Sequence, residues 1–250
     1  ICKEINLRKL NGTKLLQKKI KFPINITKEM LINDIFKKRR RMSTTKVHEK
    51  PKIGLVNGLW ANDMGVGGLI PIEVFSIPTN NKLELELTGQ LGDVMKESMR
   101  CAKTVAWNIL PNRFKEKLNN EWKNFGNTGI HIHCPDGATP KDGPSAGAAI
   151  TTAIISLLME TEVNNKIAMT GEINLKGEVT EIGGLCEKLN GAKKAGVQTV
   201  LIPNQNKSDL EKIKNGDNNP IDDNFKVILV NNIWDVINFI FNKNVKVKKY

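Results

Sequence analysis

The sequence is poor in the residues that build metal centres and disulfide frameworks. Its 250 residues include only three histidines and four cysteines. The cysteines are scattered and none form a C-x-x-C pair, which argues against a disulfide scaffold or a zinc ribbon and favours reduced thiols in an intracellular compartment. The sequence also contains no H-E-x-x-H and no G-x-x-x-x-G-K-[ST] motif, so it carries neither a zincin site nor a P-loop.

Long hydrophobic runs are also missing. No stretch reaches the roughly 18 apolar residues that a membrane helix needs. The longest run, from Ala146 to Met159, is interrupted by Thr and Ser and is typical of a buried core helix. The first residue is Ile1 and no signal peptide is recognisable, so we expect a fragment or processed product of a longer protein.

The composition is that of a globular protein with a strong basic excess. Hydrophobic residues make up 40% and charged residues 26%, and the formal net charge is +12. This charge is compatible with binding to nucleic acid or another anionic surface. The alternative that we favour is compositional bias, since Lys, Asn and Ile recur throughout the chain.

Periodicity predicts a mixed α/β (α+β) fold with strands and helices interleaved. We expect a helix before residues 11–12, a strand at 24–26 and a helix that Thr27 caps, all within residues 1–36. Residues 37–50 form a charge run that indicates a basic linker, and residues 51–250 form the main domain. In that domain strands are predicted near 69–75, 83–88, 130–133, 167–170, 199–203 and 226–230, with a hairpin over 171–179; helices are predicted at 93–110, after Ser145, at 185–195, after a Ser208 cap, and at 233–241.

Ser145 stands at the junction between a turn-rich loop and the longest apolar run. One interpretation is an N-cap, the commonest role of Ser before a helix. The other is a nucleophile, because free N–H groups at a helix start can stabilise an oxyanion. The local string, Gly143 to Gly147, reads G-P-S-A-G and matches G-x-S-x-G, but the preceding loop holds two prolines where a nucleophile elbow has a strand.

A nucleophilic serine needs a base, and the sequence offers two kinds. His131 and His133 alternate with isoleucines on a predicted strand, so both point to the same face and could approach Ser145. They could also begin a metal site, but no further ligands complete a metal set. Lys188 follows a Gly-Gly turn at a predicted helix start. To act as a base near neutrality its pKa must fall from about 10.4 to near 7, a change of about 4 kcal/mol that burial favours. Thr170 could hold the neutral amine without restoring its charge.

Four segments together resemble the proteolytic domain of the Lon family of ATP-dependent Ser–Lys proteases. They are HIHCPDGATPKDGPSAG, AMTGEINLKGEV, IGGLCEKLNGAKKAG and TVLIPNQNKSDLE, and their order and spacing are those of the family over about residues 50–242. Residues 1–36 resemble the end of the small ATPase subdomain that precedes this domain. The resemblance implies the Lon proteolytic fold, with several small mixed sheets packed against helices.

The resemblance also implies roles for individual residues. Ser145 corresponds to the nucleophile, Lys188 to the general base and Thr170 to the threonine that hydrogen-bonds this lysine. Asp142 and Gly143 belong to the loop before the nucleophile, where the acidic residue influences whether the site is open. His131 and His133 correspond to supporting strand histidines, and Trp60 and Glu73 to the substrate-side wall. Cys134 and Cys186 depart from the usual pattern and could make the site sensitive to oxidation.

By the same resemblance the chain is a serine endopeptidase domain that degrades unfolded or damaged proteins inside a homo-hexameric chamber. It needs no cofactor or metal of its own, since ATP and Mg belong to an ATPase module outside this chain. The mitochondrial matrix is the expected compartment, with another organelle or the bacterial cytoplasm as alternatives. Two other functions stay open: a catalytically silent Lon-like scaffold, and a weakly nucleic-acid-binding basic module that uses residues 37–41.

Overall fold

The computed structural model of the chain describes residues 27, 29, 31, 45–135, 141–216 and 218–241. The chain divides into two compact units, Ile1–Ser43 and Thr44–Tyr250. In the first unit the Leu31 N–H donates to the Thr27 carbonyl oxygen at 3.1 Å, at the predicted helix start. The helix and strand predicted before Thr27, and residues 37–44 of the predicted linker, lie outside the described residues.

The second unit is built on one seven-stranded mixed sheet and not on the several small sheets that the family resemblance implies. The strand order is β3-β4-β2-β1-β5-β8-β9. β2 runs antiparallel to β1 and β4, whereas β3–β4, β1–β5, β5–β8 and β8–β9 are parallel pairs. The strands are β1 (Leu55–Ala61), β2 (Gly67–Pro78), β3 (Leu85–Thr88), β4 (Thr128–His133), β5 (Ile167–Met169), β8 (Thr199–Pro203) and β9 (Lys226–Val230), and β6 (Glu172–Ile173) and β7 (Val179–Thr180) form a separate hairpin.

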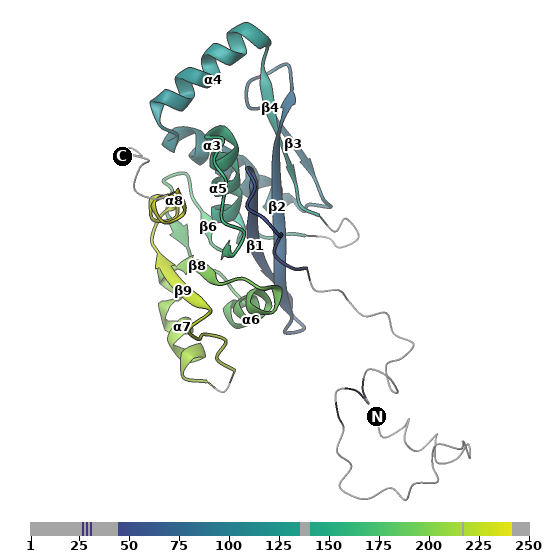
Figure 1. Ribbon diagram of the computed structural model, residues 1–250, viewed down its shortest axis with the longest axis vertical. Coiled ribbons are helices and arrows are strands. Elements are labelled where there is room, and N and C mark those ends of the chain that lie inside the picture. Colours follow the sequence, from purple (N-terminus) through teal and green to yellow (C-terminus); the bar gives the residue numbers. More distant parts are fainter. Residues whose placement is uncertain are drawn as a thin grey trace, which may run out of the picture. The chain divides into compact units, whose positions relative to one another are not determined.

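Helices cover both faces of this sheet, as alternating side chains in its strands require (Figure 1). In β5, Ile167 and Met169 join one hydrophobic cluster and Ala168 joins the other. The first cluster holds side chains of α3 (Asp93–Ile109), α5 (Gly147–Leu158) and α8 (Ile233–Phe241). The second holds side chains of α6 (Leu185–Ala195) and α7 (Lys207–Lys214). α4 (Asn112–Phe125) lies at the opposite end of the unit from α7 (Figure 1).

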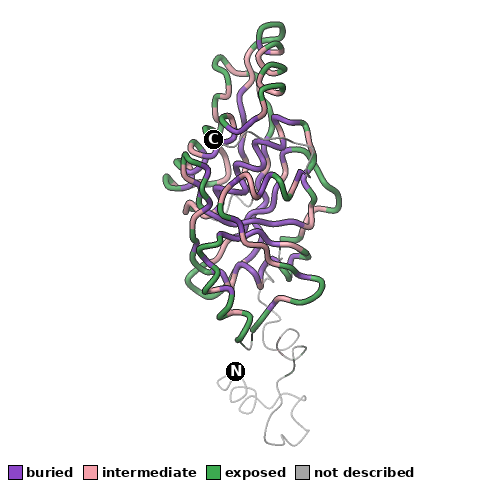
Figure 2. The backbone as a smooth tube through the Cα atoms, turned by 90° about the vertical axis from the view of Figure 1, so that its left-hand side faces the viewer, coloured by how far each residue is buried: buried purple, intermediate pink, exposed green. Residues whose placement is uncertain are grey.

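α5 is the central helix of the first cluster, and its sequence explains why. Eleven of its twelve residues are buried, as expected for a helix that is apolar all round. Two of its buried hydroxyls bond within the helix: Thr151 Oγ1 donates to the Gly147 carbonyl and Thr152 Oγ1 to the Ala148 carbonyl, both at 2.8 Å. The third, Ser156 Oγ, donates to the Thr161 carbonyl and accepts the Gly54 N–H, both outside the helix. Figure 2 shows that the buried residues are concentrated in the middle of the unit, as this packing requires. α5 therefore gives the preceding turn a rigid support.

Most elements match the sequence-based predictions, and the mixed α/β class is confirmed. Several details differ. Leu83 has φ +55° and lies outside β3, because it sits in the turn before the strand. Ser208 lies inside α7, whose N-cap is Asn206, so the predicted Ser208 cap is wrong. The charged segment after Pro111 forms α4.

The end of the predicted linker packs on the compact unit. Val47 lies against the second hydrophobic cluster, and its N–H donates to the Ala195 carbonyl at 3.0 Å. The Asn165 side-chain amide also donates to the His48 carbonyl. Residues 45–50 thus lie within the second unit, since Val47 supplies an apolar anchor in an otherwise charged stretch. Over the described ranges, no helix has the length and apolarity needed to cross a bilayer.

Candidate active site

Ser145 lies in the turn just before α5. The N-cap position of α5 belongs to Ala146, and no side chain of the described residues caps the helix. The N-cap interpretation of Ser145 is therefore wrong. The residue is half-buried, and its hydroxyl makes no hydrogen bond with any other residue that the structure describes. The hydroxyl is left available for chemistry.

The main chain of Ser145 is fixed by the segment that follows β5. The Ser145 carbonyl accepts two hydrogen bonds, from the Gly171 N–H at 2.8 Å and from Thr170 Oγ1 at 3.1 Å. In return, the Ala148 N–H donates to the Gly171 carbonyl at 3.0 Å. Thr170 is 1% exposed, so its hydroxyl bond forms in a nearly dry environment. These bonds tie the turn before α5 to the carboxyl end of a central strand.

Lys188 lies in the first turn of α6, where its N–H donates to the Gly184 carbonyl at 3.0 Å. The residue is only 4% exposed. Burial lowers its pKa from 10.5 to about 8, because an ammonium loses its hydration on leaving water. No carboxylate of the described residues forms an ion pair with it that would restore the charge. At pH 7 about a tenth of such lysines are neutral.

A pair of glycines lets α6 approach the sheet closely. A Cβ added to Gly191 would lie 2.3 Å from the Gly67 carbonyl carbon. A Cβ added to Gly67 would lie 2.2 Å from the Glu187 carbonyl oxygen and 2.8 Å from the main-chain nitrogen of Lys188. Glycine at both positions therefore brings the first turn of α6, with Lys188, against the start of β2.

Ser145 and Lys188 approach one edge of the sheet from opposite faces. Ser145 is bound to the residues after β5, and α5 packs on the first cluster. α6 packs on the second cluster, and a Cβ on Gly184, at its N-cap, would lie 2.7 Å from the Ala61 Cβ at the end of β1. Because β1 and β5 are parallel, their carboxyl ends lie at the same edge. Thr170 bonds to Ser145, and no hydrogen bond joins either residue to Lys188 in the described part of the chain.

Asp142 and Gly143 belong to the loop that leads into Ser145. Asp142 Oδ1 accepts the Met95 N–H in the first turn of α3 and the Gly143 N–H, both at 3.0 Å. Gly92 makes this approach possible, since a Cβ there would lie 2.3 Å from the Asp142 carboxylate carbon. Asp142 thus supplies the cap that α3 lacks at its own N-cap, Gly92. Gly143 has φ +124°, a backbone conformation that glycine adopts without strain.

His131 and His133 lie side by side on β4 and share one partner. Thr88 Oγ1 is 2.9 Å from His131 Nε2 and 2.7 Å from His133 Nδ1. A hydroxyl has one proton, so with neutral rings it donates to one ring nitrogen and accepts from the other. The two rings are therefore oriented as a unit. Within the described ranges no three His, Cys, Asp or Glu side chains form a metal-binding group.

Trp60 and Glu73 lie on the β1–β2 hairpin. Trp60 is opposite Gly68, where a Cβ would lie 2.9 Å from the indole Nε1, so the indole packs directly over this glycine. Glu73 is opposite Leu55 on one side and His133 on the other. The two residues therefore occupy different ends of the hairpin. Glu73, but not Trp60, is a cross-strand neighbour of the histidine pair.

Sequence reasoning missed the residues that hold the site together. Gly67, Gly92 and Gly191 make the close approaches described above, and the Met95 N–H binds Asp142. One signal was available: an isolated glycine inside a helical pattern, as at Gly191, often marks close packing. Nothing in the local sequence connects Asp142 with α3, because 47 residues separate it from Met95.

The chain is similar to known proteins over most of its length. Residues 25–243 match the family model of the Lon protease (S16) C-terminal proteolytic domain. A Lon protease homolog of Acanthamoeba polyphaga mimivirus is 41% identical over 219 residues, which are 86% of this chain and 21% of that protein. The Lon protease of Clostridium acetobutylicum is 43% identical over 186 residues, 74% of this chain and 22% of the relative. The Lon protease of Campylobacter jejuni is 40% identical over 245 residues, 95% of this chain and 30% of the relative. The chain thus spans less than a third of the length of each of these relatives.

Proposed function

Because the chain belongs to the Lon protease (S16) C-terminal proteolytic domain family, we propose that it is a serine endopeptidase domain in which Ser145 is the nucleophile and Lys188 the general base. The observation that carries this assignment is the buried Lys188 amine. Its pKa of about 8 and its lack of a carboxylate partner in the described residues make it a base near neutral pH. The Ser145 hydroxyl, which caps no helix, is the matching acid.

The proposed reaction begins when neutral Lys188 Nζ takes the proton of the Ser145 hydroxyl. Oγ then attacks the carbonyl carbon of the scissile peptide bond and a tetrahedral oxyanion forms. The ammonium of Lys188 returns the proton to the leaving amine, which departs and leaves an acyl-enzyme. Water, deprotonated by the same lysine, hydrolyses the ester and restores both side chains.

The main chain around Ser145 suggests which groups receive the oxyanion. The Gly143 N–H is bound to its neighbour Asp142, and Pro144 has no N–H. The N–H groups of Ser145 and Ala146 have no acceptor among the described residues. They precede α5, whose N-terminal end also favours negative charge. We therefore assign these two N–H groups as the oxyanion donors.

Thr170 has a positioning role in this scheme. Its bond to the Ser145 carbonyl fixes the turn that carries the nucleophile, and its place at the carboxyl end of β5 puts it at the sheet edge that both catalytic side chains approach. The lysine contact expected from the family resemblance stays a prediction.

The proposals for the whole protein rest on the relatives. We propose that its substrates are unfolded or damaged polypeptides, that ATP and Mg act in an AAA+ module outside this chain, and that the domain works as a homo-hexamer. The relatives named above are one viral and two bacterial proteins, which supports the cytoplasm alternative. The mitochondrial matrix stays a prediction.

The deciding experiment is a pair of substitutions combined with an active-site label. Ser145→Ala and Lys188→Ala should each abolish cleavage of an unfolded polypeptide and leave the circular dichroism spectrum unchanged. A peptide boronate should form an adduct at Ser145 in native mass spectrometry, and Ser145→Ala should form none. Turnover retained by either variant would overturn the assignment.

Two other functions have distinct signatures. A catalytically silent scaffold would give neither adduct nor cleavage, and the presence of both Ser145 and Lys188 argues against it. Weak nucleic-acid binding is suggested by the net charge of +12, and it predicts a steep decrease of affinity with salt concentration. Affinity that is independent of salt would exclude this second role.

A further inference from the structure

A polar pocket lies at the same sheet edge as the candidate active site, at the ends of the two strands that come next to β5 in the sheet. Its volume is about 390 Å³, within the range of ligand-binding pockets. Asn204 and Gln205 follow β8 directly, and Asn231 and Asn232 follow β9 directly. Because β5, β8 and β9 are parallel neighbours, the carboxyl ends of all three lie at one edge. This is the edge at which open α/β sheets bind ligands.

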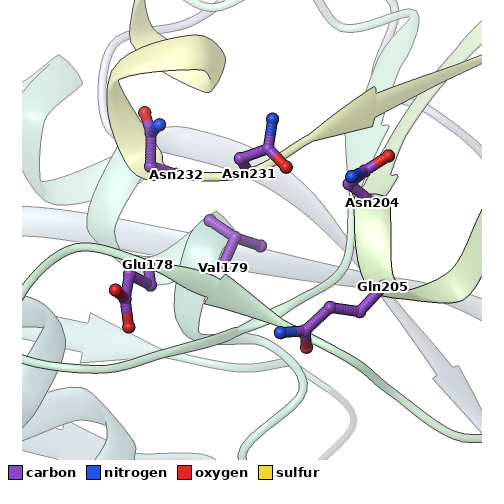
Figure 3. Close-up of a pocket in the computed structure, with 6 residues that line it drawn as sticks. All are labelled: Glu178, Val179, Asn204, Gln205, Asn231 and Asn232. Carbon is purple, nitrogen blue, oxygen red and sulfur yellow. The ribbon is translucent and has the colours of Figure 1, made fainter.

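The third wall of the pocket belongs to the β6–β7 hairpin. Glu178 and Val179 complete the lining, and Figure 3 shows Asn231 and Asn232 above Val179 and Asn204 and Gln205 to its right. The hairpin begins directly after Gly171, the residue whose N–H binds the Ser145 carbonyl. One short segment therefore connects the pocket with the nucleophile turn.

The side-chain amides of the pocket are largely open to solvent, and Asn204, Gln205 and Asn231 are exposed. The side-chain amides of Asn204 and Asn231 form no hydrogen bond with any described residue. Gln205 Oε1 accepts the Glu181 N–H at 2.9 Å and Asn232 Oδ1 accepts the Asp235 N–H at 3.1 Å. The side-chain N–H groups of both residues remain available as donors. Each free amide group offers two donors and an acceptor. The lining thus presents paired donors and acceptors with little net charge.

We propose that this pocket is an exosite that binds a short extended stretch of polypeptide substrate through its main-chain amides. The proposal rests on the proposed peptidase function, since it takes the substrate of that reaction as the ligand. Peptide N–H and C=O groups alternate along an extended chain. A side-chain amide can accept a hydrogen bond from the first and donate one to the second. None of the six lining residues is aromatic, so the pocket has no ring on which a sugar or base could stack. Its one charged lining residue is Glu178, which disfavours anionic ligands.

A main-chain exosite would suit a peptidase with varied substrates. Binding that reads only backbone amides does not depend on sequence. Because the pocket shares the sheet edge with Ser145, a bound segment adds affinity to the same polypeptide that reaches the nucleophile. Short substrates, which cannot reach both places, gain nothing from the pocket.

The first test measures binding without catalysis, on this chain carrying Ser145→Ala. The probe is an acetylated, amidated and fluorescently labelled (Gly-Ser)₆ peptide, which presents a backbone and almost no side chains. We expect the added pair Asn204→Ala and Asn231→Ala to weaken binding at least about tenfold in fluorescence anisotropy. The matched control is Asn112→Ala with Asn120→Ala, two exposed asparagines on α4. Equal binding by the two double variants would overturn the exosite, as would displacement of the peptide by equimolar maltose.

The second test separates the exosite from the proposed chemistry. With Ser145 present, the same Asn204→Ala and Asn231→Ala pair should leave kcat/KM for a four-residue substrate unchanged and raise KM for an unfolded polypeptide several-fold. Equal effects on both substrates would refute a separate exosite. If the parent chain cleaves neither substrate, the proposed function fails, and the binding experiment still decides the exosite.

Discussion

Thr170 Oγ1 donates a hydrogen bond to the Ser145 carbonyl oxygen over 3.1 Å, across 25 residues of sequence. The bond joins the turn before α5 to the residue after a central strand, and the neighbouring Gly171 N–H donates to the same carbonyl oxygen at 2.8 Å. A nucleophile held through its own main chain keeps its hydroxyl free. This arrangement makes the rigidity of the turn, rather than the side chain alone, a determinant of the proposed activity.

Thr170→Val should lower kcat and stability together. Valine keeps the shape of the buried side chain and removes only the donor, which should cost about 1 kcal/mol of unfolding free energy. We expect kcat to fall at least about tenfold because the turn loses one of its two anchors. Urea denaturation and peptidase kinetics measure the two effects.

The control for that substitution is Thr152→Val in the middle of α5, where Oγ1 donates to the Ala148 carbonyl at 2.8 Å. It removes a buried hydroxyl of the same kind, far from the turn. It should lower stability by a similar amount and leave kcat unchanged. A parallel loss of kcat in both variants would show that the Thr170 effect is general destabilisation.

The pH dependence of catalysis should follow Lys188. Only the neutral amine can accept the serine proton, so kcat/KM should rise with pH and level off above the pKa of about 8. The measurement is kcat/KM for a short uncharged peptide between pH 6 and 10. A flat profile across that range would contradict a lysine base.

The buried, protonated Lys188 should lower the free energy of unfolding at neutral pH. Its pKa is about 8 in the folded chain and 10.5 when exposed, so the unfolded state binds more protons between these values. Stability should therefore rise with pH across that window, by about 3 kcal/mol in total. Lys188→Met removes the titration. The variant should be more stable than the parent below pH 8 and lack the rise in chemical denaturation, and an unchanged slope would show that other groups cause it.

Asp142→Ala should weaken α3 and the loop before the nucleophile. The substitution removes the acceptor of the Met95 N–H, and loss of a helix cap costs about 1 kcal/mol. Asp142→Asn keeps an oxygen in place and should recover most of the stability in a thermal melt. If the Ala and Asn variants lose the same stability, the carboxylate does not act as a cap.

Gly191→Ala should separate α6 from β2. The new methyl group would overlap the Gly67 main chain at 2.3 Å, and such overpacking costs about 1–3 kcal/mol. Since Lys188 lies one turn earlier on the same face, peptidase activity should fall as well. Gly183→Ala is the control, because no atom of the described part of the chain lies within 4 Å of a Cβ at that position. Equal Tm values for the two variants would contradict the close packing.

Local sequence signals were sufficient for most elements. The helix over 185–195 begins after a Gly-Gly turn and ends at Gly196, whose φ is +91°, and the structure has these same bounds. Gly196 ends the helix because glycine adopts this conformation without strain. Pro111 likewise separates α3 from α4. Such boundaries depend on the preferences of a few adjacent residues, so they can be read from the chain.

The residues of the candidate site could also be identified from the sequence. Their burial, pKa and long-range contacts could not. A serine before an apolar run could be a cap or a nucleophile, and only the fold gives the cap position to Ala146. Burial is what lowers the pKa of Lys188, and α6, which carries this lysine, packs against β2 where Gly67 and Gly191, over a hundred residues apart, approach closely. Asp142 binds α3 for a similar reason, since Gly92 leaves room for its carboxylate. Local order follows from neighbouring residues, but solvation and long-range contacts, which set pKa and geometry, exist only once the layers have packed.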